Sequence, residues 1–216
     1  MKRINIIGSN GRIGRLLIKK LKNINVKTNK YNRLSDNIKK FKGNHSEKGK
    51  MINIDFSNSK NIKNLVGLIY KRGMYLITGT TGLSNDEAND LEKLSKLVPV
   101  FVSNNFNLGF SIFIKMLKKA KELIPYKCQL IETHHKNKKD SPSGSSKVIK
   151  KVLSIEKIYS VRYGRVIGKH KIIFSNKNNT INITHISESK ECFTSIVPYI
   201  IKFIISKKRG MFTLKL

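Results

Sequence analysis

The sequence has few cysteines and no long hydrophobic run. Its 216 residues include two cysteines, Cys128 and Cys192, and neither stands in a Cys-x-x-Cys pair or at a spacing typical of zinc. We therefore expect reduced thiols and no metal site. No stretch of eighteen apolar residues occurs, and the first residues lead into a strand-like run without a signal peptide. These absences predict a cytoplasmic protein with no membrane segment.

Acidic residues are also scarce. The chain has 13 Asp and Glu against 44 Lys and Arg, which gives a formal net charge of +31. Such a charge often indicates a nucleic-acid partner. Here the excess is almost entirely lysine and is spread along every segment, and Lys, Asn and Ile are all encoded by A- and T-rich codons. We therefore expect no specific nucleic-acid partner, although weak nonspecific binding at low salt is consistent with the charge.

A glycine-rich turn follows the first strand-like run, Arg3-Ile4-Asn5-Ile6-Ile7. The turn reads Gly8-Ser9-Asn10-Gly11-Arg12-Ile13-Gly14, and the apolar residues after it repeat at helical spacing. Glycines at its first, fourth and seventh positions allow a tight turn and a close approach to a pyrophosphate at the helix N-terminus. The spacing departs from Gly-x-Gly-x-x-Gly, and a plain turn would also explain these glycines.

Strands and helices then alternate through the N-terminal half. We expect strands at 25–28, 51–56, 74–78 and 100–103, with helices at 60–72 and 86–97. Alternation predicts a parallel sheet that binds ligands at the carboxyl ends of its strands. The last two strand ends carry Gly79-Thr80-Thr81 and Ser103-Asn104-Asn105-Phe106, which we predict to contact a cofactor. Turn formation is the alternative role for the asparagines.

The choice of cofactor depends on the end of the second strand. An acid there would hold the ribose hydroxyls of NAD, but none is present, and Lys27, Lys30 and Arg33 surround the expected place. Basic residues suit a 2′-phosphate, so NADPH is expected to serve beside NADH. The alternative is that these residues belong to the general excess of lysine.

The segment from Glu132 to Ser145 concentrates groups that move protons and hold anions. His134 and His135 carry imidazole, the side-chain group suited to proton transfer near neutral pH, and on a strand they would point to opposite faces and have different roles. Lys138 follows, and Ser143-Gly144-Ser145 opens a helix that reaches Leu153. Its N–H groups could bind a carboxylate, and the serines could also act as N-caps. The alternative is a solvated basic loop.

These motifs together resemble the dihydrodipicolinate reductase family. The resemblance extends from residue 4 to about residue 214 and rests on the order and spacing of five segments: Gly8-x-x-Gly11-Arg12-Ile13-Gly14, Ile54-Asp55-Phe56, Gly79-Thr80-Thr81-Gly82, Asn105-Phe106-Asn107-Leu108-Gly109, and Glu132-x-His134-His135-x-x-Lys138-x-Asp140-x-Pro142-Ser143-Gly144. The match weakens near Lys190, where the family pattern has arginine. The chain is also shortened after the second strand and between Leu153 and Arg162.

The resemblance implies an α/β protein with two domains. A Rossmann-type parallel-sheet domain would span residues 1–104 and be completed by 193–216, which includes an apolar helix at 195–205. An α+β domain with a mixed sheet, at 105–192, would bind substrate and join subunits into a homotetramer. The implied reaction is the NADPH- or NADH-dependent reduction of 4-hydroxy-tetrahydrodipicolinate, a cyclic dicarboxylate on the diaminopimelate route to lysine, to tetrahydrodipicolinate.

The family also implies a role for each residue of the reactive segment. His134 would be the acid/base residue, Lys138 the proton donor, and His135 a substrate contact, with Ser143, Gly144 and Ser145 binding a substrate carboxylate. Hydride addition to a conjugated ring requires such a proton. Two alternatives remain: another NAD(P)-linked oxidoreductase on the same scaffold, which has no evident need for this segment, and a decayed, basic nucleic-acid-binding protein.

Overall fold

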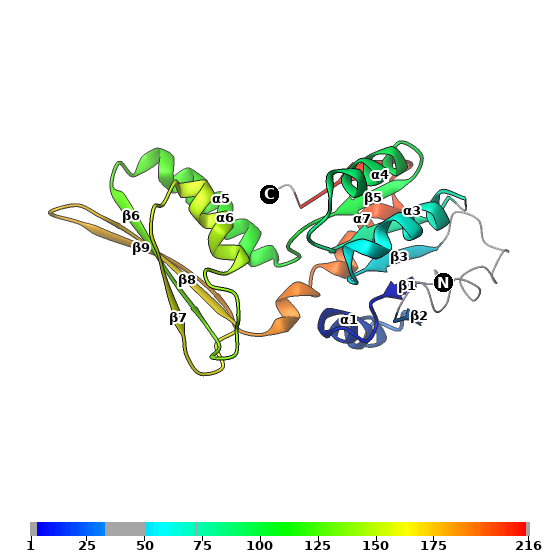
Figure 1. The fold of residues 1–216 in the computed structure, drawn as a ribbon, viewed down its shortest axis with the longest axis horizontal. Coiled ribbons are helices and arrows are strands. Elements are labelled where there is room, and N and C mark those ends of the chain that lie inside the picture. Colours follow the sequence, from blue (N-terminus) through cyan, green and yellow to red (C-terminus); the bar gives the residue numbers. More distant parts are fainter. Residues whose placement is uncertain (1–3, 33–50, 72, 215–216) are drawn as a thin grey trace. The chain divides into compact units, whose positions relative to one another are not determined.

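The protein divides into two compact units. The computed structural model describes residues 4–32, 51–71 and 73–214 (Figure 1). The first unit contains the chain up to Phe106 and the segment that returns from Phe193, and the second runs from Asn107 to Cys192. Among the described residues, no helix combines the length and apolarity needed to cross a membrane.

The first unit contains a parallel sheet of six strands in the order β10-β5-β4-β3-β1-β2. The chain passes from β1 to β2 and then crosses back to β3, so the strand order reverses beside β1, where sheets of this kind bind ligands. The predicted Rossmann-type sheet is confirmed. The strands are β1 (Ile4–Ile7), β2 (Thr28–Tyr31), β3 (Ile52–Asp55), β4 (Tyr75–Thr78), β5 (Pro99–Val102) and β10 (Gly210–Phe212). The helices are α1 (Arg12–Lys22), η2 (Ser59–Asn61), α3 (Ile62–Tyr70), α4 (Asn85–Ser95) and α7 (Val197–Ile205).

The second strand differs from its predicted position at 25–28. Asn25 adopts a left-handed backbone conformation with φ 56°, and its N–H bonds to the carbonyl of Lys22, so the chain turns before the strand begins. The observed β2 places Asn29 beside the buried Asn5, which accepts a hydrogen bond from Asn29 Nδ2 at 2.9 Å. Lys27 therefore precedes β2 and lies at its amino end. Arg33 lies outside the described residues.

Two glycines bring α1 against the end of β1. Gly8 has φ +79°, and its carbonyl accepts a hydrogen bond from Gly11 N–H at 2.9 Å. Gly14, in the first turn of α1, lies so close that an added Cβ would stand 2.2 Å from the Gly8 oxygen. The helix can approach the strand this closely because position 14 has no side chain.

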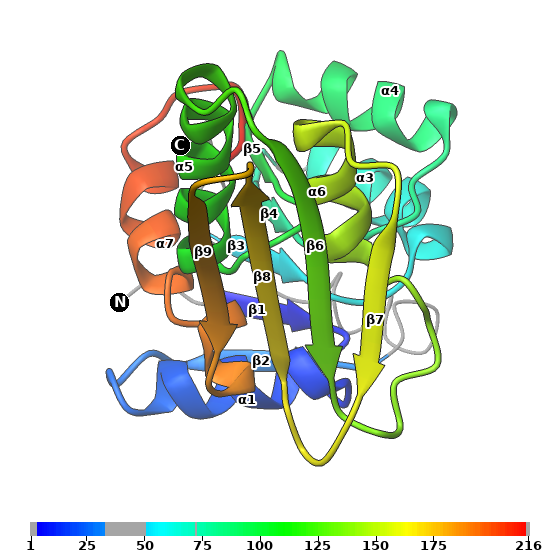
Figure 2. The same cartoon turned by 90° about the vertical axis from the view of Figure 1, so that its left-hand side faces the viewer.

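The second unit contains a mixed sheet in the order β7-β6-β8-β9. β6 (Lys127–His134) pairs in parallel with β7 (Ile158–Arg162) and antiparallel with β8 (Gly168–Ser175), which pairs antiparallel with β9 (Thr180–Ser187). α5 (Leu108–Leu123) and α6 (Gly144–Leu153) lie on one face of this sheet, and Figure 2 shows the opposite face. Element η3 (Lys190–Phe193) follows β9. The mixed sheet expected from the resemblance is confirmed.

Histidines lie within the apolar layer between this sheet and its helices. His170 of β8 is 3% exposed, and its ring centroid lies 5.7 Å from that of Phe110 on α5. Neither ring nitrogen of His170 has a hydrogen-bond partner within the described parts of the chain. Burial, together with the nearby His134 and His185, lowers the pKa of His170 to about 4. His170 is therefore neutral in the folded protein at neutral pH.

We predict that Gly14→Ala lowers the free energy of unfolding by about 2 kcal/mol, because the methyl group displaces the Gly8 carbonyl. The matched control is Gly67→Ala in α3, where an added Cβ meets nothing within 4 Å. The control should be neutral or stabilising by up to about 1 kcal/mol, as is usual for glycine in a helix interior. Urea unfolding of both variants checks this, and equal midpoints would contradict it.

We also predict acid destabilisation that originates at His170. Since folding lowers its pKa, the unfolded chain binds its proton first, and stability decreases as the pH falls from about 6.5 to about 4. The shift corresponds to a loss of about 3 kcal/mol. His170→Phe should show a smaller loss of stability between pH 7 and pH 4.5, measured by urea unfolding, than the parent and the control His135→Asn. An unchanged difference between the two pH values would rule out this origin.

Candidate active site

The predicted reactive segment lies at the carboxyl end of β6. His134 is the last residue of the strand and is buried with 6% of its surface exposed, whereas His135 follows the strand and is half-buried. The backbone beyond the strand is held by neighbours, since Tyr163 N–H donates to the His134 carbonyl at 2.9 Å and Lys136 N–H to the Gly164 carbonyl at 3.2 Å. The two imidazoles thus occupy different environments.

Glu132, two residues before His134, is fully buried at the centre of this region. Its carboxylate accepts hydrogen bonds from donors at the start of α6 and on β7: Ser143 N–H at 3.1 Å to each oxygen, Ser146 Oγ, Ser160 Oγ at 2.7 Å and Arg162 Nη2 at 2.9 Å. Burial alone would raise the pKa of Glu132, but the bonds from Ser143, Ser146, Arg162 and Ser160 outweigh it and hold the pKa well below the usual range. Glu132 is therefore ionised in the folded protein at neutral pH.

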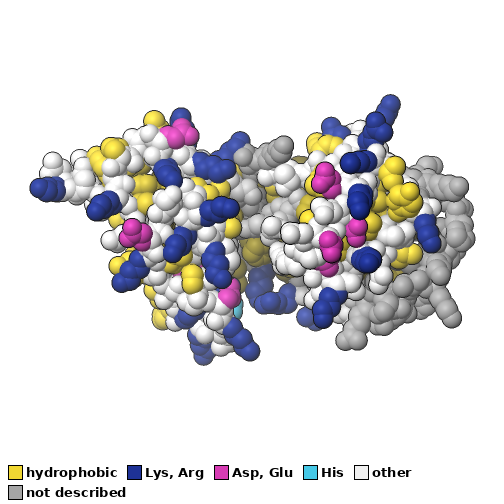
Figure 3. All heavy atoms as spheres, turned by 45° about the horizontal axis from the view of Figure 1, so that its top comes forward, with side chains coloured by type: hydrophobic (Ala, Val, Ile, Leu, Met, Phe, Trp, Pro, Cys, Tyr) yellow, Lys and Arg dark blue, Asp and Glu magenta, His cyan; other side chains and the backbone are white. Residues whose placement is uncertain are grey.

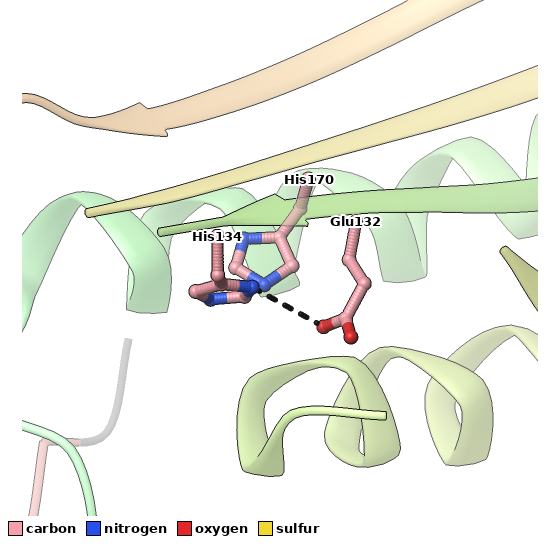
Figure 4. A group of neighbouring side chains, drawn as sticks. All are labelled: Glu132, His134 and His170. Carbon is pink, nitrogen blue, oxygen red and sulfur yellow. Dashed lines mark ion pairs between the residues drawn. The ribbon is translucent and has the colours of Figure 1, made fainter. Parts of the chain in front are cut away.

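His134 lies against this anion. Its Nδ1 is 3.6 Å from Glu132 Oε2, and its ring centroid is 5.3 Å from that of His170 (Figure 4). Burial lowers the pKa of His134, and the Glu132 charge partly opposes that effect. An added Cβ on Gly168 would stand 3.2 Å from His134 Nε2, so the glycine leaves room for the ring.

Lys138 pairs with an acid of its own loop. Its Nζ lies 2.8 Å from Asp140 Oδ1, and this ammonium lowers the pKa of Asp140. The Asp140 carboxylate also interacts with the backbone of Gly144, and the Asp140 carbonyl accepts a hydrogen bond from Arg162 Nη2 at 2.7 Å. The lysine is thus connected to the guanidinium that bonds Glu132.

The turn at 143–145 opens α6 as predicted. Ser143 is the N-cap, with its Oγ accepting from Ser146 N–H at 3.2 Å, so the capping role is present. The N–H of Ser143 is engaged by Glu132, and the residue is 2% exposed. Gly144 is exposed and Ser145 half-buried. Gly144 and Ser145 are therefore the residues of this turn that solvent can reach, whereas Ser143 is buried.

Glu132, His134 and His170 also have the spacing of a metal site, since one ligand atom from each lies within 4.8 Å of the others. Both oxygens of Glu132, however, already accept hydrogen bonds, and one of the donors is a guanidinium. A divalent cation would displace these donors and lie beside the Arg162 charge. The hydrogen-bond donors around Glu132 therefore suit a buried carboxylate that binds no metal ion.

In the first unit the predicted cofactor segments follow β1, β4 and β5 at the carboxyl edge of the sheet, with β3 between β1 and β4. The glycine turn follows β1 and leads into α1, whose N-cap Gly11 makes no side-chain capping bond. Thr80 is buried and its Oγ1 donates to Asp55 at 2.6 Å, whereas Thr81 is exposed. Backbone hydrogen bonds link successive strand ends: Phe56 N–H to the Ile7 carbonyl, Gly79 N–H to the Asp55 carbonyl, and Ser103 N–H to the Thr78 carbonyl.

Several predicted cofactor residues have roles within the fold. Phe106 is 3% exposed and packs edge-on against Phe56 with ring centroids 5.0 Å apart, and both rings occupy the space that a side chain at Gly79 would need. Ser103 Oγ bonds the backbone of Asn105 in a turn. Asn104 and Asn10 are exposed, as are Gly11 and Arg12, and Ile13 is half-buried.

Three residues of the reactive region were not predicted as site residues: Glu132, Arg162 and Asp140. Glu132 shares a strand face with His134 by simple alternation, so a signal was present. Arg162 aligns with His134 through the pairing of β6 and β7, which no local pattern reveals.

Models of both halves of one family match the chain. The model described as "Dihydrodipicolinate reductase, N-terminus" matches residues 2–106, and "Dihydrodipicolinate reductase, C-terminus" matches residues 109–216. Similar proteins agree. The 4-hydroxy-tetrahydrodipicolinate reductase of Thermosipho africanus (strain TCF52B) is 36% identical over 164 residues, which cover 75% of this chain and 76% of that protein.

Two further comparisons extend over nearly the whole chain. The 4-hydroxy-tetrahydrodipicolinate reductase of Buchnera aphidicola subsp. Cinara cedri (strain Cc) is 27% identical over 259 residues and covers 98% of this chain and 95% of the relative. The dipicolinate-bound dihydrodipicolinate reductase from Paenisporosarcina sp. TG-14 shares the fold, with a TM-score of 0.78 at 19% identity over 99% of this chain and 97% of that one. These findings give no support to a nucleic-acid-binding protein or to a different oxidoreductase. The chain belongs to the dihydrodipicolinate reductase family, a family of oxidoreductases.

Proposed function

We propose that this chain reduces 4-hydroxy-tetrahydrodipicolinate to tetrahydrodipicolinate with NADPH or NADH, on the diaminopimelate route to lysine. The observation that carries the proposal is the arrangement around Glu132, which joins His134, the loop of Lys138 and the first turn of α6 in one region. Its relatives carry the name of that reductase. Because the reaction draws on the NAD(P)H pool, we propose a cytoplasmic location.

A cyclic dicarboxylate needs cations and N–H donors for its two carboxylates. We propose that Lys138, His135, and the backbone of Gly144 and Ser145 supply them. The Asp140 carboxylate already interacts with Lys138 and with the backbone of Gly144, which supports the affinity of these groups for a carboxylate. Ser143 contributes indirectly, since its N–H is held by Glu132.

When bound, NADPH or NADH would supply the hydride, and the chain would supply the accompanying proton. The Lys138 ammonium is the proposed donor. Burial keeps His134 neutral near pH 7, so it serves as the acid/base partner that accepts and returns protons. The 4-hydroxyl group leaves as water together with a hydrogen of the adjacent ring carbon, which gives the conjugated ring. The hydride and the proton from Lys138 then add to that ring, so that one hydride and one proton are consumed overall and one water is released.

The cofactor is proposed to lie along the carboxyl edge of the parallel sheet. Gly8, Ser9, Asn10, Gly11, Arg12 and Ile13 would approach the pyrophosphate, and Gly79, Thr80, Thr81, Ser103, Asn104 and Asn105 would follow it toward the nicotinamide, with Phe106 packed beneath. The uncapped start of α1 supports this placement, because its N–H groups suit a phosphate.

We propose a homotetramer formed through the second unit. Figure 2 shows the face of the mixed sheet that carries no helix. Strand alternation and pairing place three exposed apolar side chains on the face opposite Glu132 and His134: Tyr159 at 41%, Val161 at 42% and Ile186 at 48%. Aromatic and aliphatic residues on an uncovered sheet support burial against another copy. On the face drawn in Figure 3, Lys and Arg are scattered over both units, which supports the absence of a specific nucleic-acid partner.

The proposal is tested by following NADPH oxidation optically with dihydrodipicolinate synthase, pyruvate and aspartate semialdehyde. NADPH should be consumed when all components are present.

In the same assay, His134→Gln and Lys138→Ala should each lower turnover about 10²- to 10⁴-fold, the range for loss of a positioned acid or base, with little effect on NADPH affinity. The matched control is Lys139→Ala, which removes the same charge from an exposed neighbour. Near-normal turnover in both site variants would rule out their assignment.

We further predict that NADPH binds at least as tightly as NADH, with a modest preference that decreases as salt is added. One exposed lysine paired with a 2′-phosphate contributes about 1 kcal/mol. Lys30, one residue before the carboxyl end of β2, is the described candidate, so Lys30→Ala should reduce the preference. Lys27→Ala, at the amino end, is the control and should not. Tighter binding of NADH at both low and high ionic strength would contradict this prediction.

A further inference from the structure

We propose that Glu132 and Arg162 are positioning residues of the proposed reaction: together they hold His134, the loop of Lys138 and the first turn of α6 in one arrangement. The inference rests on the proposed function for the roles of His134 and Lys138. Its structural basis lies wholly within the second unit.

The donors that bond Glu132 come from distant parts of the sequence. They lie at the start of α6 and on β7, so satisfying the buried carboxylate requires these two elements to meet at β6. The bond to Ser143 N–H fixes where the turn of α6 begins, and Glu132 Oε2 lies 3.6 Å from His134 Nδ1, a buried atom that has no hydrogen-bond partner among the described residues. One anion therefore lies beside both the turn and the histidine, and acts on the histidine through its charge.

Arg162 extends this arrangement to the lysine. Its Nη2 donates to Glu132 Oε1 at 2.9 Å and to the Asp140 carbonyl at 2.7 Å, while Asp140 Oδ1 lies 2.8 Å from Lys138 Nζ. The guanidinium side chain is 18% exposed, so these bonds are mostly shielded from water. A planar guanidinium can bridge a carboxylate and a carbonyl in fixed geometry, whereas an ammonium binds as a point charge.

The charge of Glu132 also acts on His134. The charged and titratable groups that face the imidazole are Glu132 on its own strand, Lys138 and Asp140 from the loop, Arg162 from β7, and His170 from β8, with His185 of β9 behind. Burial, Lys138 and Arg162 disfavour the imidazolium, and Glu132 is the largest influence that favours it. Loss of the Glu132 charge should therefore make His134 harder to protonate.

The first test is Glu132→Gln, which keeps the shape and removes the charge. We expect the imidazole resonances of His134, followed by NMR, to titrate at lower pH than in the parent, and the limb of the pH–rate profile that depends on His134 to move in the same direction. Turnover and the affinity for dipicolinate, the dicarboxylate probe, should each fall at least tenfold, with the Kd for NADPH within twofold. The control Glu122→Gln removes an exposed carboxylate of α5 that pairs with Lys119, and should change none of these.

A second variant keeps the inference testable if the first does not fold. Arg162→Lys retains a cation on β7, but the shorter lysine side chain does not bring its nitrogen to the position of Nη2, from which both bonds are made, so turnover and dipicolinate affinity should fall at least tenfold while the unfolding midpoint and NADPH binding are retained. If a folded Glu132→Gln titrates and turns over as the parent does, or if Arg162→Lys is indistinguishable from it, the inference is overturned. Absence of turnover in the parent would refute the proposed function alone, because the His134 titration and dipicolinate binding still test the positioning.

Discussion

A carboxylate buried away from water governs the structure of the second unit. An ionised group in such a place is strongly unfavourable unless hydrogen bonds and an opposite charge replace its hydration. Glu132 has both, from the serines of α6 and β7 and from Arg162. The carboxyl ends of β6 and β7 and the start of α6 must therefore come together for the unit to fold, and the reactive residues are attached to those three places.

The first unit contains a second buried carboxylate with a different electrostatic balance. Asp55, at the end of β3, accepts hydrogen bonds from the hydroxyls of Ser57, Thr78 and Thr80, and burial raises its pKa despite them. For Glu132 the corresponding balance lowers the pKa. One difference is that Glu132 has a guanidinium among its donors, whereas those of Asp55 are neutral. The two carboxylates thus perform similar structural work, since each ties strand ends together, but only Glu132 is accompanied by a cation.

The features that could be predicted from the sequence are those set by residues close together along the chain. The alternation of strands and helices, the glycine turn and the order of the reactive residues each lie within a local window, and the parallel sheet and the mixed sheet are present. The second strand was misplaced because the left-handed Asn25 prolongs the turn after α1, and because the pairing of Asn5 with Asn29 selects the later register. Arg162 and Asp140 could not be linked to Glu132, since their contact depends on strand pairing and on the path of a loop.

The direction of β7 determines which changes of chain length the reactive region can tolerate. β7 runs parallel to β6, so Arg162 stands at the same end as His134, while Ile158 begins the strand about 13 Å away by the rise of an extended chain. The connection from Leu153 to Ile158 joins α6 to that far end. A change of length there leaves the pairing of Arg162 with His134 in place as long as Ile155, which is buried in the core of the unit, keeps its position. A deletion between Tyr163 and Ile167 would instead shorten the segment that joins the carboxyl end of β7 to β8. One end of β7 is thus constrained by the reactive region and the other by a core contact.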